Sequence, residues 1–140
     1  PPKPAGPDAL RIPGQAASPP QPAPPAESGR GRFDGRWIAQ LSCDPFMERN
    51  AFRREWATEI RGGEVRLTGG TPGQPGYWVA EGRVGDGDRL VLAGTNIAAA
   101  KAHFGQTSPT RFDGRFGATG YEGAGGFGKR TCTLTLARAG

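Results

Sequence analysis

The feature of this chain that most restricts its fold is a period-two alternation of apolar and polar residues, in short runs separated by glycine-rich turns. The alternation begins at Gly35, after which Trp37, Ala39, Leu41 and Cys43 fall on one face of an extended segment. Similar runs recur to the end of the chain. Successive side chains of a strand point to opposite faces, so this pattern predicts half-buried β-strands. Helical periodicity is not sustained anywhere after Gly35.

Eight strands in sequence are expected. The first starts at Gly35, and the others lie near residues 54–61, around Val65 and Leu67, and near residues 77–83, 89–94, 97–104, 114–121 and 130–138. Gly62-Gly63 and the run at residues 85–88 provide tight turns between strands. Eight short strands joined in this way predict an all-β fold, an eight-stranded antiparallel up-and-down β-barrel.

The first part of the chain has a different composition. Ten of the 14 prolines lie within the first 25 residues. Proline fixes φ and removes a backbone donor, so residues 1–31 are expected to form an extended arm or linker before a barrel domain at residues 32–140. Such a segment cannot bury enough apolar surface to form a core. It could serve as a semi-rigid spacer or as an arm that lies along a partner protein.

The two cysteines provide a test of barrel closure. In a closed eight-stranded meander, the first and last strands are antiparallel neighbours. If Cys43 lies opposite Cys132, then Trp37 faces Arg138, and the apolar residues between them meet on one inner face. We expect a disulfide, although two free buried cysteines would also fit this face. A bridge would constrain the unfolded chain by roughly 4 kcal/mol and would indicate an oxidising compartment.

The ends of the first and last strands resemble a known signature. Gly35-Arg36-Trp37 opens the first strand and Arg138 closes the last, which resembles the signature of the calycin superfamily of lipocalins, fatty-acid-binding proteins and avidins. The resemblance covers roughly residues 33–138. In that superfamily the tryptophan packs at the closed end of the barrel, under a basic side chain from the final strand. The resemblance therefore implies a barrel and the possibility of an interior ligand, and no ligand-contacting residue of avidin can be matched.

A repeated motif is consistent with a defined closed end. Arg32-Phe33-Asp34-Gly35-Arg36 recurs as Arg111-Phe112-Asp113-Gly114-Arg115, and an aromatic residue follows each copy. We expect both copies to precede strands that start at the same end of the barrel, with Asp-Gly forming the turn. A carbohydrate- or metal-binding repeat is the alternative. The residues expected to close that end are Phe33, Gly35, Trp37, Phe112, Phe116 and Arg138.

Charge and hydropathy restrict the class of partner. The net charge is +5, but the arginines are scattered among acidic residues, so binding of nucleic acid is poorly supported. No apolar stretch is long enough to span a bilayer. The sequence starts Pro1-Pro2-Lys3 without an initiator methionine, as would a mature form whose signal peptide has been removed, and as would an artificially cut chain. With the expected disulfide, these features predict a periplasmic or secreted protein.

Few motifs suggest chemistry. Residues 123–131 nearly match a phosphate-binding loop, but Arg130 stands where a Ser or Thr would hold magnesium, and a strand follows instead of a helix. His103, the single histidine, has no local nucleophile or metal-ligating neighbour, and Asp86 and Asp88 lack the rest of a calcium loop. We expect no catalytic residue, no metal site and no cofactor. The alternative is an enzyme that uses His103 or Asp34 near the barrel mouth.

Aromatic residues exceed what a minimal barrel has to bury. Those expected to contact a ligand or partner are Phe46, Phe52, Trp56, Tyr77 and Trp78, and packing in the core is the plainer role for them. The leading hypothesis is a non-catalytic accessory subunit of an extracytoplasmic complex, which docks on a larger protein through the barrel surface and the proline-rich arm. In size the chain resembles the small subunits of bacterial periplasmic oxidoreductases such as the quinoprotein alcohol dehydrogenases. The alternative is a calycin-like carrier of a small apolar ligand in the barrel interior.

Overall fold

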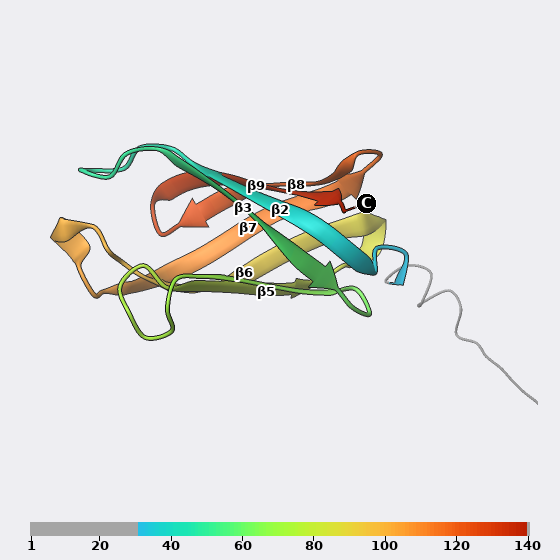
Figure 1. The fold of residues 1–140 in the computed structure, drawn as a ribbon, viewed down its shortest axis with the longest axis horizontal. Helices are drawn as coiled ribbons and strands as arrows, with labels where there is room; N and C mark the ends of the chain where they lie inside the picture. Colours follow the sequence, from blue (N-terminus) through green and yellow to red (C-terminus); the bar gives the residue numbers. More distant parts are fainter. Residues whose placement is uncertain (1–30, 140) are drawn as a thin grey trace, which may run out of the picture.

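In a computed structural model of the chain, the described residues are 31–139, and they form one antiparallel sheet that curls into a nearly closed barrel (Figure 1). Its eight strands are β2 (Gly35–Cys43), β3 (Phe52–Ile60), β4 (Glu64–Gly69), β5 (Trp78–Arg83), β6 (Arg89–Ile97), β7 (Thr107–Gly117), β8 (Gly120–Phe127) and β9 (Arg130–Arg138). Two short 3₁₀ turns, η1 (Asp86–Asp88) and η2 (Lys101–His103), lie before and after β6. Residues 1–30 of the predicted arm lie outside the described residues, so its division from the barrel stays a prediction.

The order of the strands in the sheet is β3-β2-β9-β8-β7-β6-β5-β4. Pairing of β2 with β9 joins the first and last strands, which leaves β3 and β4 as the two edges. The tight turn at Gly62-Gly63 connects these edges, and the backbones of Arg61 and Glu64 form one bridge there. No ladder continues from it, so the barrel stays open along the seam between β3 and β4. The all-β prediction of eight antiparallel strands is confirmed, and this architecture is compatible with a calycin-like fold.

The predicted closure between the first and last strands is confirmed residue by residue. Cys43 pairs with Cys132 and the two form a disulfide, and Trp37 pairs with Arg138. The intervening inward residues of both strands are buried, because directly opposed residues share one face of a sheet. A slip of one residue would have turned these side chains to solvent, so the hydrophobic pattern and the cysteines specify one register.

Two predicted strands are wrong in place. The sixth, expected near residues 97–104, is a loop that carries η2, because β6 continues to Ile97 and β7 begins only at Thr107. The seventh, expected near residues 114–121, straddles the turn between β7 and β8. For the seventh strand the cause is glycine content: positions 114, 117, 120, 123, 125 and 126 are glycines, so they contribute no apolar side chain to an alternating pattern.

The second copy of the repeated motif therefore does not precede a strand. Arg111–Arg115 lies within β7, and Gly114 forms no turn there: it is paired with Leu90 on one side and Gly123 on the other. A Cβ at Gly114 would lie 1.9 Å from the carbonyl oxygen of Glu122. The glycine is needed because β8 approaches the backbone of β7 closely at this point.

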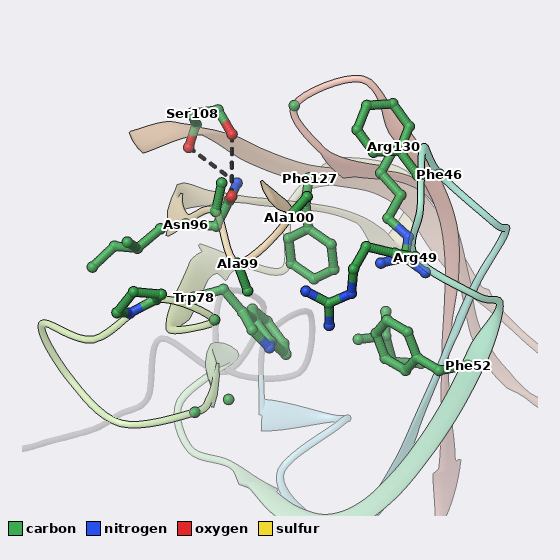
Figure 2. Close-up of a pocket in the computed structure, with 18 of the residues that line it drawn as sticks. Phe46, Arg49, Phe52, Trp78, Asn96, Ala99, Ala100, Ser108, Phe127 and Arg130 are labelled. Atoms are coloured by element: carbon green, nitrogen blue, oxygen red, sulfur yellow. Dashed lines mark hydrogen bonds between the residues drawn. The ribbon is translucent and has the colours of Figure 1, made fainter. Parts of the chain in front are cut away.

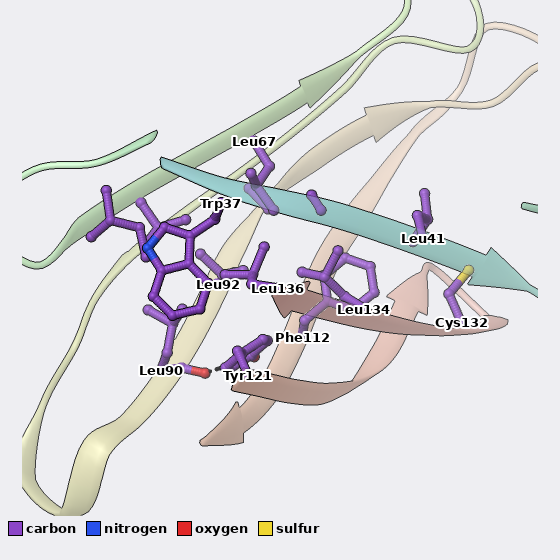
Figure 3. Close-up of a cluster of buried hydrophobic side chains, with 14 of the residues drawn as sticks. Trp37, Leu41, Leu67, Leu90, Leu92, Phe112, Tyr121, Cys132, Leu134 and Leu136 are labelled. Carbon is purple, nitrogen blue, oxygen red and sulfur yellow. Dashed lines mark hydrogen bonds between the residues drawn. The ribbon is translucent and has the colours of Figure 1, made fainter. Parts of the chain in front are cut away.

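The barrel has two unlike ends. At the closed end β2 begins and β9 ends, and at the open end β2 ends, β9 begins and the longer connections 44–51, 70–77 and 98–106 lie (Figure 1). The closed half is filled with side chains from all the long strands, as Figure 3 shows for the cluster around Tyr121. Its fully buried members include Leu90, Leu92, Phe112, Leu134 and Leu136.

Candidate functional site

The closed end is sealed by three aromatic rings. Phe33 stacks on Phe116 with ring centroids 4.0 Å apart, and Trp37 meets Phe116 edge-on at 5.3 Å. The guanidinium of Arg138 lies 4.5 Å from the centre of the Trp37 ring, as the calycin resemblance implied. Phe112 is not part of this plug: it lies in the middle of β7, where its ring meets that of Phe127 at 6.0 Å.

Hydrogen bonds to the backbone fix the same end. The Arg138 guanidinium donates to the carbonyl oxygens of Asp34 and Arg32 at 2.9 and 2.7 Å. The Asp34 carboxylate accepts the backbone N–H groups of Gly62 and Gly63 at 2.7 and 2.9 Å. Asp34 therefore holds the β3–β4 turn, and the suggestion that it lies near the barrel mouth is wrong.

A hollow of about 1140 Å³ occupies the open end (Figure 2). Its walls come from the inner faces of β3, β5, β6 and β8, from the start of β9, and from the three open-end connections. It continues along the seam where β3 and β4 separate, since both Trp56 of β3 and Thr68 of β4 line it. Side chains thus fill one half of the barrel and leave the other half accessible from outside.

Aromatic rings line the inner part of this hollow. Trp78 is 8% exposed and contacts Trp56 edge-on at 6.0 Å and Phe127 edge-on at 5.3 Å. Trp56 and Phe127 are only partly buried, and the fully buried Leu41 also lines the hollow. Within the described residues no hydrogen bond occupies the indole N–H of Trp56 or Trp78. These side chains offer flat apolar surface together with donor groups, a combination suited to a small molecule.

A buried amide, Asn96, forms part of the same wall as Trp78, with which it is directly paired across β5 and β6. The Asn96 side-chain nitrogen donates to the carbonyl oxygens of Ser108 and Pro109 and to the hydroxyl of Thr110, at 3.1–3.2 Å. Its oxygen accepts the hydroxyl of Ser108 at 3.1 Å, a pair drawn in Figure 2. Asn96 is therefore satisfied by β7, and it ties β6 to β7 where the hollow would otherwise weaken the sheet.

Arginines border the mouth. Arg49 comes from the β2–β3 connection, Arg54 from β3 and Arg130 from the start of β9, and all three line the hollow. Arg54 pairs with the inward-facing Leu41, so it belongs to the inner face of its strand. The guanidinium carbons of Arg130 and Arg54 lie 4.9 and 5.7 Å from the centre of the Phe52 ring. Positive charge thus surrounds one aromatic ring at the entrance.

Arg130 is held in place by the backbone. It donates from Nε to the carbonyl oxygen of Asp44 at 2.9 Å and from Nη2 to that of Asn50 at 2.6 Å. Partial burial lowers the pKa of Arg130, and repulsion from the nearby charge of Arg49 lowers it further, while Asp44 opposes the shift. The group remains a cation at any physiological pH, because an arginine titrates far above that range.

The aromatic residues predicted to contact a ligand or partner divide into two groups. Phe46, Phe52, Trp56 and Trp78 all line the hollow, whereas Tyr77, which precedes β5, does not. Sequence reasoning missed Arg54, Arg130, Asn96 and Phe127 as lining residues. For Arg54 a signal was present: two positions before Trp56, it continues the inward alternation of the second strand.

Of the two side chains that the sequence offered for catalysis, one lies at this end. His103, the single imidazole of the chain, lines the hollow from η2, and Asp34 lies at the other end of the barrel. Among residues 31–139 no group of three or more His, Cys, Asp or Glu side chains is arranged to hold a metal ion. The groups that do converge are aromatic faces, amides and guanidiniums.

Comparison with known proteins gives no relative: no family model, no curated protein and no solved structure matches the chain. In the described part of the chain, no helix has the length and apolar character required to cross a membrane.

Proposed function

We propose that this protein is a non-catalytic binding protein that holds a small molecule with an apolar or aromatic body in the hollow at the open end of the barrel. The observation that carries the proposal is the division of the barrel interior. One half is packed, and the other retains about 1140 Å³ lined by Trp56, Trp78, Phe127 and Phe52. Ligand pockets in proteins are of this size and of this mixed apolar and polar lining.

Burial energetics supports the same role. An aromatic side chain that stays partly in water forgoes part of its transfer free energy, roughly 25 cal/mol for each Å² left uncovered. Trp56 and Phe127 face inward yet remain only partly buried, so the fold does not complete their burial. A ligand seated on them would remove this apolar surface from water. The packed half supplies a core that does not depend on the ligand.

The direct test is recovery of the ligand. The protein is purified under gentle conditions from the envelope of its native host and analysed by mass spectrometry under native and denaturing conditions. We expect a small molecule that is released on denaturation and that is absent from a Trp56→Ala/Trp78→Ala variant. A matched Tyr77→Ala variant, altered outside the hollow, should retain it. The proposal would be refuted if the wild-type protein carried no small molecule and if no apolar probe quenched its tryptophan fluorescence.

A role as an accessory subunit of an extracytoplasmic complex is a second proposal. Met47 and Phe104 are 56% and 66% exposed, they are the large hydrophobic residues that stand exposed among the described residues, and both lie on connections at the open end. Exposed apolar side chains gathered at one end suit docking on a protein. The Cys43–Cys132 disulfide is compatible with a periplasmic or secreted location.

This second proposal has its own test. The tagged full chain, a form without residues 1–30, and a Met47→Ser/Phe104→Ser variant are purified from the envelope in parallel. A stoichiometric larger protein that is retained by the full chain and lost from either altered form would support docking. If all three forms retain the same proteins, neither the arm nor the open-end loops form the contact.

A further inference from the structure

The arginines that line the hollow have no carboxylate partner among the described residues: Arg49, Arg54 and Arg130 form no ion pair there. On the outer face of the barrel some arginines are paired, namely Arg66 with Glu81, Arg83 with Glu64 and Arg89 with Asp113. The guanidinium groups of the hollow are therefore not held by a carboxylate of the described residues.

The one carboxylate that lines the hollow does not compensate these charges. Glu55 pairs across the sheet with Gln40, and both belong to the outer face of their strands, where the Gln40 amide donates to the Glu55 carboxylate at 3.4 Å. Lys129 also lines the hollow, so its lining carries four cationic side chains and this one carboxylate. Two further carboxylates lie near the mouth: the charge of Asp44 acts on Arg130, and the Glu48 carboxylate accepts the backbone N–H of Lys101. The side chains around the mouth therefore keep a net positive charge.

The guanidinium groups converge and keep donors free. Arg54 and Arg130 both contact the Phe52 ring, and Figure 2 shows Arg49 reaching into the hollow from the β2–β3 connection, towards Trp78. Arg130 uses Nε and one N–H of Nη2 for the backbone, which leaves three of its five N–H groups free. Arginines arranged in this way suit an oxyanion such as a carboxylate or sulfonate, two of whose oxygens can accept hydrogen bonds from one guanidinium.

The depth of the hollow limits the size of the body attached to that anion. Below the Trp56–Trp78 pair the barrel is filled by fully buried side chains, among them Leu67, Phe112 and Leu134. A long acyl chain has no space to run towards the closed end. A compact ring system fits between the aromatic residues and the mouth, with its anionic group beside the arginines.

We propose that the ligand is a compact aromatic anion, whose ring system lies on Trp56, Trp78 and Phe127 and whose carboxylate or sulfonate is bound by Arg49, Arg54 and Arg130. This inference rests on the proposed function, because it names the ligand class of the same hollow. It adds a requirement that the apolar lining alone does not make, namely a negative charge at one end of the ligand.

The test uses two fluorescent probes that share a skeleton. One is 8-anilinonaphthalene-1-sulfonate, an aromatic anion, and the other is N-phenyl-1-naphthylamine, the same skeleton without the sulfonate. Binding to the full chain is followed by probe fluorescence and by energy transfer from tryptophan. The key variant is Arg49→Gln/Arg54→Gln, since neither side chain makes a hydrogen bond within the described residues. The control is Arg66→Gln on the outer face, and thermal unfolding checks that every variant is folded.

We expect the wild type to bind the anionic probe at least about tenfold more tightly than the neutral one, because a charge-assisted hydrogen bond is worth roughly one to two decades in affinity. The double variant should remove most of this preference and leave the neutral probe unaffected, whereas Arg66→Gln should change neither. Salt should weaken binding of the anion alone. Equal affinity for the two probes, or an unchanged preference in the double variant, overturns this inference while the hollow still binds. If neither probe binds, the proposed function fails with it.

Discussion

Opening the Cys43–Cys132 disulfide should destabilise the protein strongly without abolishing the barrel. The bridge joins β2 to β9 at the open end, and the two cysteines are 89 residues apart in sequence. Six further residue pairs, from Trp37 with Arg138 to Ser42 with Thr133, hold the same two strands together. The reduced chain therefore keeps the closing ladder and loses only its covalent tie.

The size of the effect follows from the length of the closed loop. In the chain-entropy model, a cross-link over about 90 residues removes roughly 15 cal/mol/K of entropy from the unfolded chain, or about 4.5 kcal/mol at 25 °C. A domain of this size loses about 4–6 °C in Tm per kcal/mol, so reduction should lower Tm by roughly 20 °C. The unfolded reduced chain also exposes more surface, and the denaturant m-value should rise.

The assay is urea unfolding of the oxidised and reduced wild type, followed by tryptophan fluorescence and far-UV circular dichroism. This pair differs only in the cross-link, and a Cys43→Ala/Cys132→Ala variant provides a form that cannot reoxidise. A loss of 3–5 kcal/mol with a native-like spectrum in the absence of urea would support the reasoning. A loss below about 1 kcal/mol would refute it, because the denatured chain would then be equally restricted without the bridge.

Three further outcomes are expected. Gly114→Ala should destabilise the protein by about 3 kcal/mol or more, because its Cβ would meet the Glu122 carbonyl oxygen. Gly117→Ala is the control, and it should cost less than about 1 kcal/mol because there is open space around its Cβ. Equal urea midpoints for the two variants would contradict this expectation. Burial raises the pKa of Tyr121 to about 12. The free energy of unfolding should therefore be unaffected by this group below pH 10 and should fall by roughly 2–3 kcal/mol as the pH rises through 12. A flat profile of unfolding free energy over that range would contradict this expectation. Arg138→Gln, which loses two carbonyl contacts and the indole face, should lower the free energy of unfolding by about 1–2 kcal/mol, and an unchanged value would show that the plug does not need it.

The strand register at the closure could be predicted because several independent signals coincide there. Inward alternation in the first and last strands, the two cysteines, and the Trp37–Arg138 pair all require the same alignment. Each position carries a side chain whose burial would change if the strands slipped by one residue, so the sequence pattern determines the register. The disulfide and the meander follow from the same residues.

The region from residue 107 to residue 126 could not be predicted in the same way. Glycine supplies neither an apolar nor a polar side chain, so β8 shows no alternation beyond Tyr121 and Phe127. Gly114 is required by a close tertiary contact with β8, which the sequence does not show. The same Asp-Gly dipeptide is also typical of turns, so the sequence does not distinguish the two roles. The motif copy in β7 was consequently interpreted as a strand start.

The hollow itself depends on a difference between strands that their individual patterns do not show. Trp56 and Ile60 both face inward on β3, yet Ile60 is fully buried and Trp56 is not, because β3 leaves β4 after the Gly62-Gly63 turn. Whether an inward side chain meets a partner depends on the separation of two edges, which is a property of the closed sheet. Periodicity predicts which face of a strand a residue occupies, but it does not predict whether the interior next to that residue is packed.

The two ends of the barrel are stabilised by different means. At the closed end, stacked rings and Arg138 join β2 to the rest of the barrel through close packing. At the open end, side chains leave about 1140 Å³ unfilled, so dispersion contacts there are fewer and β2 and β9 have less to hold them. The Cys43–Cys132 bridge stands at this end. A covalent tie acts on the unfolded chain and needs no filled interior, so it can stabilise the pairing of β2 with β9 at an end whose interior is not filled.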